Sequence, residues 1–241
     1  MPKCSALLII IVLIMLAPAA YASYPQGCAD PAYQDYINGR FFQSQKRNRR
    51  LLDDTLRDYK VSVSVGHNLY QVIADLSRHL KYSAQFEPPE MVHLKIDRVF
   101  EHADELSVEQ RIAGDVFDRF STETHAVGIA RAWLAYRQDE TALAFKELLS
   151  SIDITGSALL STYGPDFDFV RQIYRDGYTD TVIAYLEKTK SFWLGDKPDE
   201  LRNTWLKMIE AGCQIHFDSI DTLKADQLGI IDVRKALGVE G

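Results

Sequence analysis

The sequence has few cysteines, no grouped glycines and no excess of positive charge. Three cysteines in 241 residues are too few for a disulfide scaffold or a protein that holds several metal ions. Thirteen scattered glycines form no phosphate-binding loop and no dinucleotide fingerprint. Acidic residues number 34 against 27 basic ones, and this negative balance argues against a protein that coats nucleic acid. Hydrophobic residues, at 46%, are enough for a globular core of one large or two small domains.

Long apolar runs are also absent, except at the N-terminus. Lys3 precedes an uncharged apolar run over 6–17, and Ala20-Tyr21-Ala22 is the small-x-small pattern that signal peptidase accepts. This predicts a signal peptide over 1–22 and an exported protein, periplasmic or secreted, that begins at Ser23. The alternative is an uncleaved anchor, but a membrane span needs ~20 apolar residues.

Cleavage would leave two cysteines, Cys28 and Cys213. An even pair in an oxidising compartment predicts one disulfide, and two free thiols are the alternative. Cys213 and His216 also have the spacing of two metal ligands. A metal site needs three or four ligands, and the sequence has no second cluster, so we expect no metal and no cofactor.

Residues 23–57 form the first mature zone, with apolar residues at helical spacing that predict an amphipathic helical segment. The zone contains a basic patch. The solvated face of a helix is the first interpretation of this patch. Contact with anionic lipid or another acidic partner is the second, and a convertase site ending at Arg50 is the third. The patch consists of Lys46, Arg47, Arg49 and Arg50.

Residues 58–122 predict a small α+β domain. Valines alternate with polar residues over 59–65, and shorter alternations follow over 82–86 and 92–96, which predicts three strands. Between the first two lies helical spacing over 69–80, with Asn68 as N-cap. A capping box over 107–110 opens a second helix. The order is strand–helix–strand–strand–helix.

This order resembles the short N-terminal domain shared by secretins and TonB-dependent receptors. The similar features are the strands over 61–65 and 92–96, the helix over 69–80, and Leu106-Ser107-Val108-Glu109 at a helix start. The last strands of the family pattern and the barrel strands have no counterpart after Phe120. The resemblance implies a periplasmic docking module for envelope machinery.

Residues 123–241 predict a domain of helical hairpins. Apolar residues at helical spacing recur in short segments, and glycines such as Gly164 and Gly212 end them. The stretch over 132–144 is faintly similar to a tetratricopeptide repeat, although no 34-residue period follows. The predicted fold class is therefore mostly α, a small α+β unit followed by a helical-hairpin array or bundle.

No group of residues in the sequence predicts catalysis. His79 and His93 fall on the polar sides of their predicted elements, so we expect surface histidines. The pair Asp166 and Asp168 is explained by a helix start, where carboxylates favour the helix dipole. A glycosidase would need a particular spatial separation of two carboxylates. No Gly-x-Ser-x-Gly motif is present.

A candidate surface for binding a protein partner lies at the end of a predicted helix, in Phe192, Trp193 and Leu194. We therefore expect an interaction or adaptor protein of an envelope assembly (secretion, pilus or receptor machinery) without catalysis of its own. Its partners would be envelope proteins, with anionic lipid as a peripheral contact of the basic patch and no nucleic acid. The alternative is a secreted hydrolase whose carboxylates converge only in three dimensions. A deep pocket with carboxylates of altered pKa would favour the hydrolase.

Overall fold

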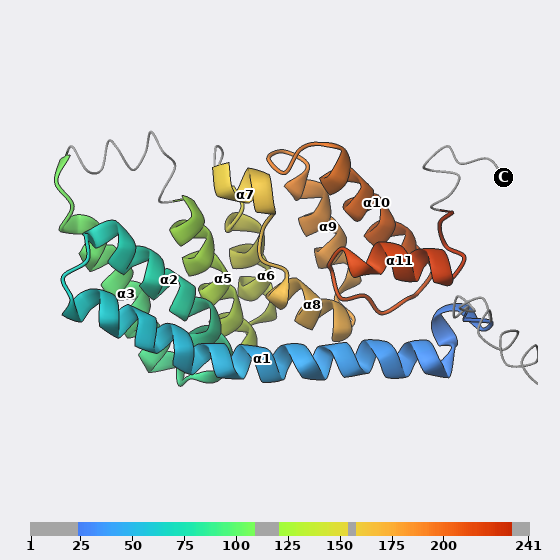
Figure 1. Ribbon diagram of the computed structural model, residues 1–241, viewed down its shortest axis with the longest axis horizontal. Coiled ribbons are helices and arrows are strands. Elements are labelled where there is room, and N and C mark those ends of the chain that lie inside the picture. Colours follow the sequence, from blue (N-terminus) through green and yellow to red (C-terminus); the bar gives the residue numbers. More distant parts are fainter. Residues whose placement is uncertain (1–23, 109–120, 154–157, 233–241) are drawn as a thin grey trace, which may run out of the picture.

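The computed structural model describes residues 24–108, 121–153 and 158–232 (Figure 1). The predicted signal peptide over 1–22 and most of the helix expected after Ser107 lie outside these residues. In the part of the chain that is described, the regular elements are helices and there is no strand. They are η2 (Gly27–Ala29), α1 (Pro31–Ser64), α2 (Leu69–Phe86), α3 (Pro89–Asp104), α5 (Ser121–Arg137), α6 (Thr141–Ser150), α7 (Ala158–Tyr163), α8 (Asp168–Arg175), α9 (Thr179–Thr189), α10 (Asp196–Glu210) and α11 (Ile220–Gln227).

Helix α1 extends along one edge of the molecule, and the other helices stand beside it in a row (Figure 1). Its 34 residues span about 51 Å at 1.5 Å per residue. The C-terminal half of α1 packs against α2, which also contacts α3 and α5. The N-terminal half of α1 meets α8 and the segment between α10 and α11. One helix therefore contacts both the first and the last parts of the helical row.

The predicted α+β unit is wrong, because all three expected strands are helical. Residues 59–64 end α1, and Val65 is its C-cap. Val61, Val63 and Val65 are 48%, 50% and 61% exposed. The stripe that α1 buries includes Asn48, Thr55 and Ser62, which recur every seven residues. Helical periodicity is thus present, but polar residues carry it and the alternating valines face outward.

The other two strand predictions fail for a related reason. Residues 82–86 end α2, and residues 92–96 lie within α3. Val92, Ile96 and Val99 are buried at the 4–3 spacing of a helix, whereas Leu94 is 63% exposed. The apparent period of two arose because an exposed apolar residue fell between two buried ones.

The helical prediction for the C-terminal part is confirmed over the described residues. Helices α6 to α11 all lie within the predicted helical domain over 123–241. Gly164 and Gly212 follow α7 and α10 with φ of +79° and +73°, where a side chain would be strained. The Asn68 side chain accepts a hydrogen bond from the Gln71 amide at 3.0 Å, which confirms the N-cap of α2. Helix α1 runs through residues 57 and 58 without a break. Of the segments that resemble the secretin domain, those over 61–64, 69–80 and 92–96 are helical.

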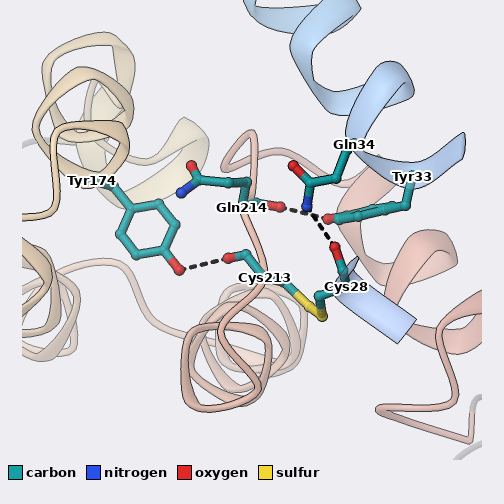
Figure 2. Close-up of a disulfide and its surroundings, with 6 residues drawn as sticks. All are labelled: Cys28, Tyr33, Gln34, Tyr174, Cys213 and Gln214. Atoms are coloured by element: carbon teal, nitrogen blue, oxygen red, sulfur yellow. Dashed lines mark hydrogen bonds between the residues drawn. A yellow bond between two sulfur atoms is a disulfide. The ribbon is translucent and has the colours of Figure 1, made fainter. Parts of the chain in front are cut away.

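The predicted disulfide between Cys28 and Cys213 is confirmed, with the two Cα atoms 4.9 Å apart (Figure 2). Tyrosine hydroxyls hold the backbone beside it. Tyr174 donates to the Cys213 carbonyl at 2.6 Å, and Tyr33 donates to the Gln214 carbonyl at 2.5 Å. The bond therefore fastens the start of α1 to the segment between α10 and α11. In the described chain, no helix has the length and hydropathy of a membrane span.

Three histidines are buried where surface positions were expected. His79, His125 and His216 are each at most 4% exposed, whereas His93 is exposed as predicted. The Nδ1 atom of His79 lies 3.1 Å from the Thr55 hydroxyl of α1. Burial, together with the charge of Lys95, lowers the pKa of His79 to about 4.

The contribution of His79 to the stability of the protein should therefore fall between pH 7 and pH 5. In the unfolded chain His79 binds a proton below about pH 6.5, whereas in the folded chain it does so only below about pH 4. Acid therefore favours the unfolded state. This residue should account for about 2 kcal/mol of the loss. Urea unfolding at both pH values would measure it. His79→Gln should show a smaller difference between pH 7 and pH 5, and an equal difference would contradict the assignment.

Candidate functional site

A hollow lined by four arginines lies where the N-terminal half of α1 faces α8 and the segment between α10 and α11. Its volume is about 660 Å³. We call it the arginine cavity. Its lining residues are Tyr36, Gly39, Arg40, Gln43, Ser44, Arg47, Arg50, Arg171, His216 and Asp218.

Helical spacing explains how α1 supplies one wall of the arginine cavity. Arg40, Ser44 and Arg47 are separated by four and three residues, so they share one face of the helix. Arg171 projects from α8, and His216 and Asp218 follow the disulfide-bonded Cys213. The site thus joins residues more than 120 positions apart in the chain.

The basic patch predicted from the sequence divides between two faces of α1. Arg47 and Arg50 line the arginine cavity. Arg49 points elsewhere, with its guanidinium 5.1 Å from the centre of the Phe86 ring. Lys46 is exposed. Only two of the four predicted residues therefore contribute to the cavity.

The arginine cavity carries a surplus of positive charge. Arg40 forms an ion pair with Asp218 at 2.5 Å, and Arg171 pairs with Asp168 of α8 at 2.6 Å. Arg47 and Arg50 form no ion pair with any residue that the structure describes. Because the whole chain has a net charge of −7, this concentration of unpaired arginines is local. Such a cavity attracts anions.

A continuous chain of hydrogen bonds crosses the wall of the arginine cavity. The Ser44 hydroxyl lies 2.8 Å from His216 Nε2, and His216 Nδ1 lies 2.8 Å from Asp218 Oδ2. An ionised carboxylate can only accept, so Nδ1 carries the proton and Nε2 accepts from the serine. The order is serine, histidine, aspartate.

The charges around this chain fix the protonation of its members. Burial lowers the pKa of His216, and the nearby guanidinium groups of Arg171 and Arg40 lower it further, against the opposing effect of Asp218. Burial alone would raise the pKa of Asp218, but the His216 hydrogen bond and the Arg40 charge bring it to about 2. At neutral pH the imidazole is therefore neutral and the carboxylate is ionised.

Neighbouring groups hold the segment that carries His216 and Asp218. Arg171 Nε donates to the His216 carbonyl at 2.7 Å. The buried Asp221 carboxylate accepts from the Asp218 amide at 2.9 Å and from the Trp205 indole at 3.1 Å. Burial raises the pKa of Asp221 to about 6. With the disulfide at Cys213, these contacts fix the two side chains against α1.

A smaller cavity of about 200 Å³ lies beside the first, and Ser44 and Arg171 line both. Asp168 also lines the smaller cavity. Lys81 forms ion pairs with Asp168 and with Asp166, and these are the two carboxylates that the sequence placed at a helix start. The Asp166 carboxylate accepts the Asp168 amide at 2.7 Å, as expected for such a start. Lys81 and Arg171 overcome the effect of burial and hold the pKa of Asp168 at about 2, so it is no proton donor near neutral pH.

The predicted partner-binding segment is divided between the core and the surface. Phe192 and Trp193 are buried, whereas Leu194 is 66% exposed. The Trp193 ring packs against Phe167 and Trp205, with centroid distances of 6.0 and 6.1 Å. A partner would reach Leu194 but not the two aromatic rings.

The sequence indicated part of the arginine cavity and missed the rest. The basic patch pointed to Arg47 and Arg50. Ser44, Arg171 and Asp218 had no motif, and His216 was considered only for its spacing from Cys213.

Among the described residues, no group of three or more metal-ligating side chains occurs. Comparisons with protein-family models, curated proteins and solved structures gave no match.

Proposed function

We propose that the protein is an exported adaptor of an envelope assembly, and that its arginine cavity binds an acidic segment of a partner protein. The observation that carries this proposal is that Arg47 and Arg50 form no ion pair with any described residue, although they line a cavity that also contains Arg40 and Arg171. Guanidinium groups bind carboxylates through two parallel hydrogen bonds. The disulfide is compatible with an oxidising compartment outside the cytoplasm.

The shape of the site favours a protein segment over a membrane surface. Arg171 is buried and Arg40 is partly buried, so both lie below the outer rim that Arg47 and Arg50 form. A flat layer of lipid headgroups would meet the exposed arginines only. Acidic side chains that project from a peptide can enter the hollow and reach the buried pair.

The test is binding of a fluorescent glutamate-rich peptide, measured by anisotropy on the full exported chain. Arg47→Gln and Arg50→Gln should each weaken the affinity about tenfold, the value of one charge-assisted hydrogen bond. Arg49→Gln is the matched control. It removes the same charge from the same basic patch, but its side chain lies on Phe86, so the affinity should change less than twofold.

Two outcomes would overturn this proposal. The first is an equal loss of affinity in all three variants, since that would indicate a general effect of charge rather than a cavity. The second is binding to vesicles that contain phosphatidylglycerol with no binding to the peptide, which would assign the patch to a lipid surface. Higher salt should weaken peptide binding, because the exposed arginines are screened.

A further inference from the structure

The chain of hydrogen bonds from Ser44 through His216 to Asp218 has the order of a nucleophile, a base and a group that orients the base. Acyl-transferring enzymes of unrelated folds share this order, and they are identified by geometry rather than by sequence position. Both hydrogen bonds measure 2.8 Å. Ser44 and His216 are 172 positions apart, so no motif search could join them.

We propose that Ser44 is the nucleophile of an esterase site, with His216 as its general base and Asp218 as the residue that positions the imidazole. The substrate class is a carboxylic ester that carries a negative charge, since the nucleophile opens into the arginine cavity. The preference for a charged ester rests on the proposed anion binding. The assignment of Ser44 as nucleophile is independent of it.

The protonation of the three groups suits this role. A neutral imidazole can accept the serine proton, and the ionised Asp218 keeps the other ring nitrogen protonated. The charged groups that face His216 are Asp218, Arg40 and Arg171. The two guanidinium groups disfavour the imidazolium, but they also favour the negative charge that develops on the substrate.

Ser44 is only 8% exposed, but it lies in the walls of two hollows that it shares with a positive group. Its side chain lines both hollows, as does Arg171. Ser44 lies within α1, where its backbone N–H already donates inside the helix. Stabilisation of an oxyanion must therefore come from side chains. Arg171 is fixed by the His216 carbonyl and by Asp168, which makes its guanidinium the preorganised donor.

The reaction would proceed in two balanced stages. The Ser44 oxygen bonds to the ester carbonyl carbon while its proton passes to His216 Nε2, and the alcohol then leaves with that proton. Water next attacks the acyl carbon and gives a proton to His216. The bond between the acyl group and Ser44 breaks, and the serine oxygen recovers the proton. One ester and one water give one acid and one alcohol.

A fluorophosphonate probe tests the nucleophile directly in the full exported chain with its disulfide intact. The Ser44 oxygen should form a bond to phosphorus while fluoride leaves, and peptide mass spectrometry should locate the adduct on Ser44. His216→Gln should slow labelling at least a hundredfold, because it removes the general base. Ser62→Ala is the control. Ser62 is a buried serine of the same helix that donates to Asp75 instead of a histidine, so labelling should not change.

Two further measurements separate catalysis from a structural role. In Asp218→Asn, the pH at which labelling reaches half its maximal rate should differ from the wild-type value. No such shift is expected if Asp218 only ties α1 to the segment after Cys213. The protein should also hydrolyse 4-nitrophenyl succinate at least tenfold faster than 4-nitrophenyl acetate. Arg47→Gln should reduce that preference, and equal rates on the two esters would overturn the substrate class.

Circular dichroism and melting temperature establish that each variant is folded. If His216→Gln does not fold, Ser44→Ala gives the decision, because it should abolish both the adduct and the hydrolysis of the ester. No adduct on Ser44 in folded wild-type protein, or an equal rate of labelling in folded His216→Gln, would overturn the proposal. Ser44→Ala should still bind the glutamate-rich peptide. Wild-type protein that binds the peptide but is not labelled at Ser44 would refute the esterase alone.

Discussion

Replacing Cys28 with alanine should lower the free energy of unfolding by about 5 kcal/mol. The disulfide with Cys213 closes a loop of 185 residues, and the entropy that such a loop removes from the unfolded chain has this size. The loss would be comparable to the whole stability of many domains. Denaturation by urea, followed by circular dichroism, would measure it.

The double variant provides the control for this prediction. Cys28→Ala and Cys213→Ala each remove the same bond, so together they should cost little more than one alone. Cys28 is the cleaner single site, because it is only partly buried, whereas Cys213 is fully buried. A loss below about 1 kcal/mol in both single variants would show that the bond contributes little to stability, contrary to the chain-entropy argument.

Replacing Trp193 with alanine should cost about 3–5 kcal/mol, the usual cost of emptying an aromatic core position. The indole is 6% exposed, and the Arg202 guanidinium lies 5.5 Å from its centre. Leu194→Ala is the matched control at the next position, since that side chain is mostly exposed and should change stability by no more than ~0.5 kcal/mol. Thermal or urea unfolding measures both. An unchanged melting temperature in Trp193→Ala would restore the partner-binding interpretation of this residue.

A second substitution tests the same packing from the opposite side. A Cβ atom placed on Gly164 would lie 2.8 Å from Trp193 Cε2, at a φ of +79°. Gly164→Ala should therefore combine a steric cost with about 1–2 kcal/mol for the left-handed backbone. In the Trp193→Ala background only the backbone cost should remain. Equal costs in the two backgrounds would show that the ring and the glycine do not interact.

The sequence predicted helices where apolar residues occupy the buried stripe, as in α5, α6 and α8. It also predicted the first part of α1, within 23–57. It failed at the end of α1, where Ser62 is buried and the valines are exposed, and over 82–86 and 92–96, where apolar alternation is typical of a strand. Asn48, Thr55 and Ser62 are buried in α1 because each has a hydrogen-bonding partner across the interface, such as Asp168 for Asn48 and Asp75 for Ser62. Those partners come from other segments, so the periodicity of hydrophobic residues alone could not show that α1 continues to Ser64.

The arginine cavity shows the same limit at the level of function. Arg47 and Arg50 were visible as part of a charged run, but the run did not show which of its members share a face with Arg171. Ser44 and His216 became a pair only through the packing of α1 against the segment after Cys213. The disulfide predicted from the cysteine count already implied that the start of α1 lies near the segment after Cys213. It did not give the register that aligns the serine with the imidazole.

The position of α1 imposes an order on folding. The partners of its N-terminal half are among the last residues to be synthesised, since Tyr33, Arg40 and Ser44 contact Gln214, Asp218 and His216. Its C-terminal half packs mainly against α2, the next helix along the chain. The two halves of one helix therefore differ in contact order, and long-range contacts form slowly. An emerging chain can complete the pairing of α1 with α2 early, while the half that carries the arginine cavity must wait for residues 213–218.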